Sequence, residues 1–230
     1  MRADTLAALN AARADKARVC LVRYLEGGEE ALIVDGRAVL GEVPADVAEA
    51  AAGALRRDQS ATADTSRGRA FLQVFNPPLR MIIIGAVHIA QALAPMAALS
   101  GYQVTVIDPR RAFATDSRFP DVAMTGDWPD DAMTALAPDR RTAVVALTHD
   151  PKLDDPGLDV ALRSEAFYIA ALGSRRNHAG RLQRLRELGH DEATLARIHG
   201  PAGLDIGAIS PAEIAIAILA EMTRALRGAG

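Results

Sequence analysis

The sequence has little cysteine, no long apolar run and little excess charge, and each shortage excludes a class of protein. Cys20 is the single cysteine among 230 residues, which excludes an internal disulfide framework. The cysteine content is compatible with a reducing compartment. No apolar run approaches the roughly 20 residues of a membrane-spanning helix, and residues 1–18 lack the apolar core of a signal peptide. The net charge of −3 does not indicate nucleic acid or an anionic membrane as a partner. We therefore expect a cytoplasmic protein.

Residues 1–76 have the pattern of a small α+β domain. Two apolar segments, ARVCLVRYL and EALIVDG, flank the turn signal Glu26–Glu29 and predict a hairpin. A helix is expected in PADVAEAAAGALRRD and a strand in AFLQVF. Cys20 lies among alternating apolar residues, which favours a buried structural thiol. Two consecutive prolines then follow in NPPLR and indicate a domain boundary, because neither fits a helix interior or a central strand.

Residues 77–230 alternate between apolar strands and helices. The predicted strands are RMIIIG, QVTVID, a weaker one near DVAMTG, AVVALT and FYIAALG. Helices are expected at 88–99, about 128–136, 158–164, 177–188 and from Ser210, where Pro211 and Glu213 complete a capping box. Continuous apolar strands separated by helices predict an α/β fold, a Rossmann-like doubly wound parallel sheet. Its first and fourth strands should flank a ligand crevice at their carboxyl ends.

The first strand runs into an incomplete dinucleotide-binding loop. The Gly-x-Gly-x-x-Gly/Ala pattern is represented by Gly85, Val87 and Ala90. Gly85 is either an ordinary tight-turn glycine or part of a phosphate site, and Val87 disfavours close approach of a pyrophosphate. Asp108 ends the second strand, where it either binds a ribose or only forms a turn before Pro109.

Two histidines follow strands of the predicted sheet. His88 lies in the first turn of a helix, whose positive dipole end disfavours its protonation, so it either contacts a ligand or only packs there. His149 follows the AVVALT strand, beside Asp150. Together His88, His149 and Asp150 could form a metal or acid/base cluster, but their spacing matches no metal-ligand pattern, so we assign no metal site.

The segment GSRRNH has the strongest pattern of a binding site. Gly173, Ser174, Arg175 and Arg176 lead into a helix N-terminus, where backbone N–H groups and guanidinium groups together suit a phosphate or another oxyanion. The alternative is a solvated basic turn, because arginines 181, 184 and 186 farther along this helix are interpreted as surface residues.

The segment GLDIGA predicts a rigid loop over the strand ends. Asp205 lies between two glycines, the second of which is Gly207, directly before the capped helix. The loop either holds Asp205 near the crevice as an acid or has only turn chemistry.

Four segments together resemble the XdhC/CoxI family of accessory factors for xanthine dehydrogenase and carbon monoxide dehydrogenase. They include THDPKLDD, ALGSRR and GLDIGA, and the likeness runs in the same order from Phe75 to Thr223. The resemblance implies a Rossmann-like C-terminal domain and a role in the maturation of molybdenum hydroxylases. That role consists of binding the molybdenum cofactor (molybdopterin) and assisting its sulfuration or insertion into the apo-enzyme.

The chain departs from this family at two places. The family usually reads Gly-x-Gly-His where this sequence has Val87, and longer members carry Ser-x-Pro-Arg and Gly-Gly-Cys segments that are absent here. Cys20 lies in a different setting, so no cofactor-ligating role is assigned to it. The partners that the resemblance implies are a molybdenum hydroxylase apo-enzyme, a cysteine desulfurase and a longer XdhC-type protein, and a homodimer is a further expectation.

Three functions remain open from the sequence. We expect a cofactor-binding chaperone rather than a catalyst. The alternatives are an NAD(P)-dependent oxidoreductase that uses Asp108, which Val87 disfavours, and a nucleotide-binding scaffold protein. The predicted cofactor-binding residues are Gly85, Val87, His88, Asp108, His149, Gly173, Ser174, Arg175, Arg176, Asp205 and Gly207.

Overall fold

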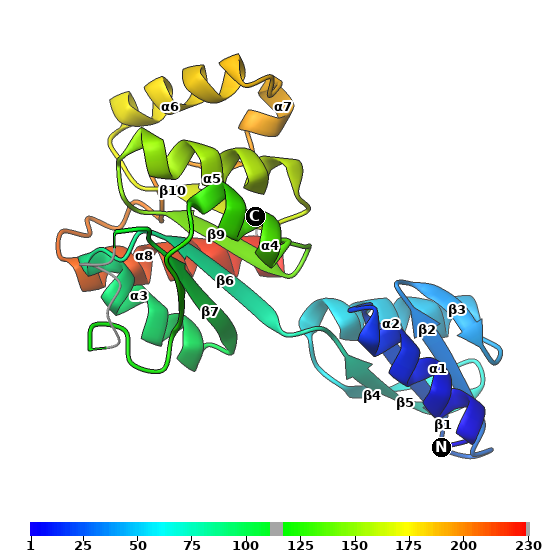
Figure 1. Cartoon of the computed structure of the whole chain (residues 1–230). Helices are drawn as coiled ribbons and strands as arrows, with labels where there is room; N and C mark the ends of the chain where they lie inside the picture. The colour runs from blue at the N-terminus through cyan, green and yellow to red at the C-terminus, as the bar shows by residue number, and fades with distance from the viewer. Residues whose placement is uncertain (111–116, 229–230) are drawn as a thin grey trace. The chain divides into compact units, whose positions relative to one another are not determined.

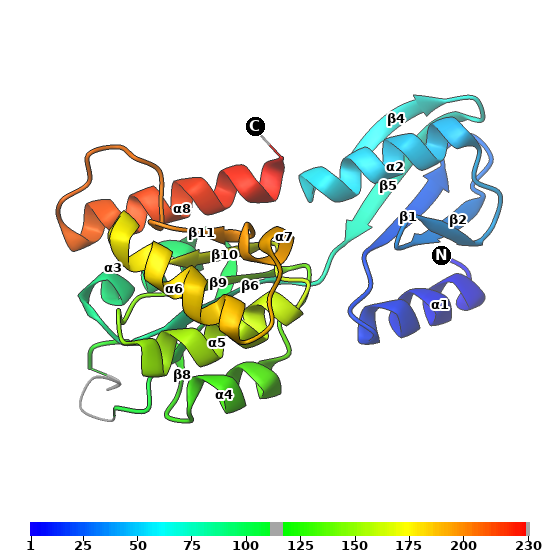
Figure 2. The same ribbon diagram turned by 90° about the horizontal axis from the view of Figure 1, so that it is seen from above.

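The chain divides into two compact units, Met1–Pro77 and Pro78–Gly230. They are described from a computed structural model that covers residues 1–110 and 117–228 (Figures 1 and 2). Within these ranges no helix has the length and apolar character needed to cross a membrane.

The first unit is a five-stranded antiparallel sheet with two helices. Its strand order is β3-β2-β1-β5-β4. The predicted hairpin is confirmed, because β1 and β2 pair in antiparallel fashion from Arg23 opposite Glu30 to Val19 opposite Val34. The sequence prediction missed α1, β3 and β4. In chain order the elements are α1 (Ala3–Ala14), β1 (Val19–Tyr24), β2 (Glu30–Val34), β3 (Arg37–Leu40), α2 (Ala45–Arg57), β4 (Ala61–Thr65) and β5 (Gly68–Phe75).

Strand β1 is buried on both faces of this sheet. Cys20 and Val22 belong to the apolar cluster that includes α2, while Val19 and Leu21 cluster with Leu9 of α1. Cys20 is fully buried, as expected of a structural thiol, and burial raises its pKa to about 12. The thiol is therefore uncharged at neutral pH in the folded chain.

The second unit is a six-stranded parallel sheet with the order β11-β10-β9-β6-β7-β8. This order confirms the doubly wound prediction and places the first strand, β6, beside the fourth, β9, so their carboxyl ends lie together. The elements are β6 (Leu79–Ile84), α3 (His88–Leu99), β7 (Tyr102–Ile107), β8 (Ala123–Thr125), α4 (Pro129–Leu136), β9 (Thr142–Ala146), α5 (Pro151–Arg163), β10 (Tyr168–Ala171), α6 (Arg175–Glu187), α7 (Glu192–Leu195), β11 (Ile198–His199) and α8 (Pro211–Arg227).

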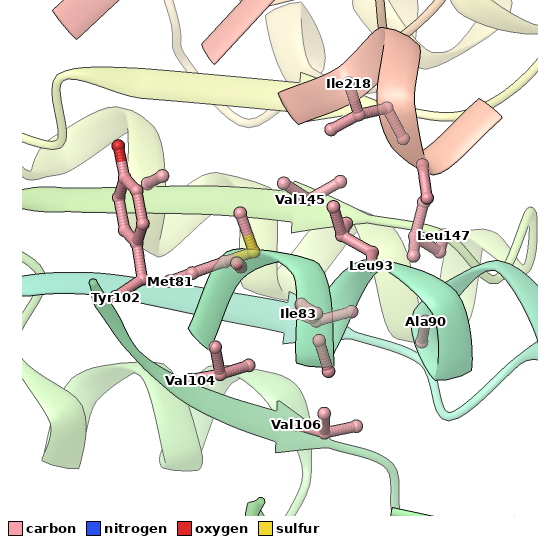
Figure 3. Close-up of a cluster of buried hydrophobic side chains, with 14 of the residues drawn as sticks. Met81, Ile83, Ala90, Leu93, Tyr102, Val104, Val106, Val145, Leu147 and Ile218 are labelled. Atoms are coloured by element: carbon pink, nitrogen blue, oxygen red, sulfur yellow. The ribbon is translucent and has the colours of Figure 1, made fainter. Parts of the chain in front are cut away.

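Helices cover both faces of the parallel sheet. On one face, Leu93 of α3 and Ile218 of α8 pack with Met81, Ile83 and Val145 of the central strands (Figure 3). Residues of α4, α5, α6 and α7 pack on the other face, in a cluster built around alternate residues of the same strands. Each central strand is thus buried on both sides, which accounts for its continuous apolar sequence.

Helix ends follow the predicted capping residues, with one correction. Ser210 caps α8 by accepting a hydrogen bond from Glu213 N, and the capping box is present. Helix α5 was predicted to begin at Leu158, but it begins at Pro151, because Asp150 caps it and accepts a hydrogen bond from Lys152 N. Proline is well placed at this first helical position, since its nitrogen needs no partner there. Two short elements, α7 and β11, were not predicted.

Candidate functional site

Gly85 directly follows β6 at the carboxyl edge of the sheet, next to the residues that follow β9. Its φ of +106° is in the region that favours glycine. A Cβ atom here would lie 2.4 Å from Cγ2 of Thr148, the second residue after β9. This glycine is therefore required by the turn and by the neighbouring strand, whichever ligand binds nearby.

Asp108 is fully buried beneath the glycine loop and is saturated with hydrogen bonds. Its Oδ2 accepts from Ala86 N (2.8 Å) and from Arg110 Nη2 (2.8 Å), and its Oδ1 accepts from Arg110 N and Nε (both 2.9 Å). Burial alone would raise the pKa of Asp108, but the bonds from Arg110 and Ala86 outweigh it and the pKa is lowered. A carboxylate has about four acceptor sites, and these four hydrogen bonds use them all. Asp108 therefore holds the glycine loop at Ala86 and the side chain of Arg110 in place.

Ser174 and Gly173 shape the start of α6. The Ser174 hydroxyl accepts a hydrogen bond from Asn177 N (3.2 Å) and caps the helix. Gly173 has a φ of +140°, and a Cβ there would lie 3.3 Å from Asn177 Cβ and 3.6 Å from His149 Nδ1. The first turn contains no acidic residue, so its free backbone N–H groups and the helix dipole favour an anion.

The first two residues of α6 line two different hollows. Arg175 lines a hollow of about 320 Å³, here called the α8 hollow. Arg176 lines a second hollow of about 260 Å³, here called the α6 hollow. Both side chains are exposed, and within the described ranges neither forms an ion pair.

The α8 hollow is bounded by the GLDIGA loop and by α8. Asp205 and Gly207 line it together with Arg175. Its complete lining is Leu172, Arg175, Pro201, Ala202, Gly203, Leu204, Asp205, Ile206, Gly207, Ala208, Ile214 and Ala217. The wall is therefore partly apolar, with a cation and a carboxylate on it.

Glu221 of α8 holds the loop of the α8 hollow in place. Its buried Oε2 accepts hydrogen bonds from the Tyr168 hydroxyl of β10 (2.7 Å) and from Gly203 N (3.0 Å), and its Oε1 lies 3.2 Å from His199 Nδ1. Leu204 N also donates to Ala217 O (3.2 Å). Burial, followed by the bond to Glu221, raises the pKa of Tyr168. The tyrosine therefore remains a neutral donor to the carboxylate.

The α6 hollow lies between the start of α5 and one side of α6. His149, Pro151, Arg176, Asn177, Gly180, Arg181 and Arg184 line it. The His149 backbone has a φ of +63° and is held by Asp154, whose carboxylate accepts from His149 N (3.0 Å) and from Thr148 Oγ1 (2.6 Å). Burial raises the pKa of Asp154, although these bonds and Arg181 oppose the shift.

The prediction that Arg181 and Arg184 are surface residues of α6 is wrong for Arg181. This side chain is 4% exposed, and its Nη2 lies 3.5 Å from Asp154 Oδ2. Arg184 is partly exposed and donates to Asp155 Oδ1 (3.1 Å). Sequence reasoning missed Asp154 and Asp155, although Asp154 precedes Leu158 and Ala161 at helical spacing and was detectable as a core-facing position.

The structure separates the predicted site residues into four groups. Arg175, Asp205 and Gly207 line the α8 hollow, and His149 and Arg176 line the α6 hollow. Gly173 and Ser174 lie directly before the first residue of α6. The remaining four, Gly85, Val87, His88 and Asp108, line neither hollow, and the same holds for Gly173 and Ser174. Among the described residues, no three histidine, cysteine, aspartate or glutamate side chains are grouped so as to hold a metal ion.

Comparison with known proteins identifies the family. The family model described as the XdhC Rossmann domain matches residues 81–222, which include most of β6 and most of α8. The chain belongs to the XdhC family. The XdhC match contains the start of α6 and both hollows.

Curated relatives resemble the XdhC domain over part of their length. YqeB, an uncharacterized protein of Escherichia coli (strain K12), is 34% identical over 66% of this chain and 28% of its own. The molybdenum cofactor insertion chaperone PaoD of the same organism is 34% identical over 64% of this chain and 40% of its own. A probable xanthine dehydrogenase subunit of Bacillus subtilis (strain 168) is 33% identical over 66% of this chain and 44% of its own. The matched region thus spans less than half of each relative.

A solved structure resembles almost the whole chain. It is a Bacillus halodurans protein described as a xanthine dehydrogenase, with a TM-score of 0.70 and 25% sequence identity. The likeness covers 95% of this chain and 65% of that one. It therefore extends beyond the XdhC Rossmann domain into Met1–Pro77.

Proposed function

We propose that this XdhC protein binds the molybdenum cofactor as cargo and assists its insertion into a molybdenum hydroxylase apo-enzyme. The observation that carries the proposal is the α8 hollow, where Arg175 lies in an acid-free helix start beside a partly apolar wall. The name of the relative PaoD, a molybdenum cofactor insertion chaperone, supports this cargo.

The residues of the α8 hollow fit the parts of molybdopterin. Its phosphate is matched by the Arg175 guanidinium and by the free backbone N–H groups at the start of α6. The ring system suits the apolar side chains of Leu172 and Ile214, and Asp205 can accept hydrogen bonds from ring N–H groups. A volume of about 320 Å³ lies at the lower end of the range for small-molecule sites.

The role proposed for these residues is binding and delivery rather than bond-breaking. Arg175 and the α6 backbone would hold the phosphate, and Glu221 would fix the loop that closes the hollow. The proposed recipient is a molybdenum hydroxylase apo-enzyme. A cysteine desulfurase that sulfurates the bound cofactor, a longer XdhC-type partner and a homodimer belong to the same proposal.

Recovery of bound pterin tests the proposal. The chain is purified from cells that make molybdenum cofactor, and released pterin is oxidised and measured by fluorescence and mass. Arg175→Ala should reduce pterin recovery about 10-fold or more, because a charge-assisted hydrogen bond contributes about 1.5–3 kcal/mol. The matched control is Arg140→Ala, since Arg140 is exposed, pairs with Glu165 and precedes β9 at the opposite edge of the sheet.

Two results would contradict the proposal. One is recovery of nicotinamide dinucleotide without any pterin, and the other is equal pterin recovery from the Arg175→Ala and Arg140→Ala variants. Recovery of no small molecule at all would favour a scaffold protein.

The alternative, an NAD(P)-dependent oxidoreductase, is favoured by the strand order around β6 and by the position of Asp108 at the end of β7. Against it, Val87 replaces the second loop glycine, and the four hydrogen bonds that Asp108 accepts leave it little capacity for a ribose. NAD(P)H titration separates the two functions, because a ribose-binding role requires Asp108→Ala to weaken nucleotide binding.

A further inference from the structure

Arg181 has buried hydrogen-bond donors that the rest of the described chain does not use. Its side chain is 4% exposed and lines the α6 hollow. Nη2 donates to Leu172 O (2.9 Å) and lies 3.5 Å from Asp154 Oδ2. Within residues 1–110 and 117–228, Nε and Nη1 have no hydrogen-bond partner. A guanidinium has five N–H donors, three of them on these two nitrogens, and buried donors in proteins are normally paired.

The charges around the α6 hollow leave an excess of positive charge. Asp154 faces Arg181, and it also accepts hydrogen bonds from Thr148 and His149. Asp155 forms an ion pair with Arg184, which leaves Arg176 as the third arginine of the hollow. Asp150 lies beside the hollow, but it is exposed and caps α5 through Lys152 N. The two buried carboxylates, of Asp154 and Asp155, are therefore outnumbered by the three guanidinium groups that line the hollow.

The shape of the hollow leaves room for a small oxyanion. Gly180 contributes no side chain to its wall, and a Cβ there would be in ordinary contact 3.6 Å from Arg184 Nη1. The Asn177 amide and the His149 ring supply further polar groups. The volume of about 260 Å³ is many times the roughly 10–15 Å³ that a cavity needs to hold one water molecule.

We propose that the α6 hollow is a second anion site, separate from the α8 hollow, which binds a phosphate-class oxyanion through Arg176 and the unused donors of Arg181. The planar guanidinium of Arg181 has donors in the fork geometry that matches two phosphate oxygens. Arg176 supplies the unbalanced charge at the entrance. The site accepts either free phosphate or the phosphoryl group of a nucleotide. It does not depend on pterin binding in the α8 hollow.

Calorimetric titration of the purified chain with inorganic phosphate, and separately with ADP, tests this site. Arg176→Ala should weaken phosphate binding about 10-fold or more. Arg181→Lys should do the same, because lysine keeps the positive charge beside Asp154 but lacks the fork of donors. Arg140→Ala is the matched control, since Arg140 lines neither hollow and pairs with Glu165 at the opposite edge of the sheet, and it should change the phosphate Kd less than twofold. Circular dichroism checks that each variant is folded, and Arg176→Ala, an exposed change, tests the site even if Arg181→Lys does not fold.

Each outcome of these titrations either supports or overturns the proposed anion site. If ADP binds more tightly than phosphate, the site exists and its ligand is the phosphoryl group of a nucleotide. If the two bind equally, the site exists and its ligand is free phosphate. Absence of phosphate binding at about 10 mM, where even a Kd of 1 mM gives near-saturation, overturns the proposal. Loss of binding in Arg175→Ala but not in Arg176→Ala also overturns it, because it moves the anion to the α8 hollow. Pterin recovery plays no part in these readouts, so the two proposals fail independently.

Discussion

Replacement of Gly85 by alanine is expected to destabilise the parallel sheet for two separable reasons. The φ of +106° is unfavourable for a residue with a side chain, which costs about 1–3 kcal/mol. The added Cβ would also lie 2.4 Å from Thr148 Cγ2, and such overpacking costs about 1–3 kcal/mol. The sum is about 2–6 kcal/mol, or a Tm lower by roughly 10 °C in a unit of this size.

Two further variants separate these two costs. Gly101→Ala is the control for backbone strain, because Gly101 has a φ of +89° and a Cβ there would meet no atom within 4 Å. Thr148→Ser removes Cγ2 but keeps the hydroxyl that donates to Asp154 (2.6 Å). The double variant Gly85→Ala/Thr148→Ser should therefore regain the steric part, about 1–3 kcal/mol.

Urea denaturation followed by far-ultraviolet circular dichroism measures these free energies of unfolding. The curves are fitted with two transitions, because the chain has two compact units and only the second is changed. If Gly85→Ala costs no more than Gly101→Ala, or if Thr148→Ser restores nothing, then the contact with Thr148 is not what requires glycine at this position.

Two other predictions follow from buried ionisable groups. Asp108→Asn should cost about 1.5–3 kcal/mol near pH 7. Because the folded-state pKa of Asp108 is lowered, its stabilisation is present above the ordinary value of 3.8 and is lost as the pH falls through the lowered pKa. Urea midpoints of both proteins between pH 7 and 3 measure this, and a difference that does not change with pH would contradict it. Cys20, whose pKa burial raises to about 12, should react with a thiol reagent orders of magnitude more slowly in the folded chain than in urea. Equal rates in the two conditions would contradict the burial of Cys20.

The burial of the acids and arginines is the part of the site that the sequence predicted least well. Arg181 was interpreted as a surface residue because α6 is rich in arginine, yet its side chain is buried against Asp154. Asp154 was overlooked because α5 was predicted to begin seven residues too late, at Leu158 rather than Pro151. Once Asp150 is recognised as the cap, Asp154 falls on the same helix stripe as Leu158 and Ala161, and its burial becomes predictable.

The sequence by itself determined the parallel sheet, the capped helix α8 and the anion-favouring start of α6. These features depend on local signals, namely runs of apolar residues, capping side chains and glycines at turns, which act over a few neighbouring positions. Only the tertiary structure decided that Asp108 is saturated by Arg110 and Ala86, that Arg175 and Arg176 enter different hollows, and that Glu221 holds the loop at Gly203. The partners in these contacts come from different elements, and periodicity along one segment carries no information about which distant group will satisfy a buried charge.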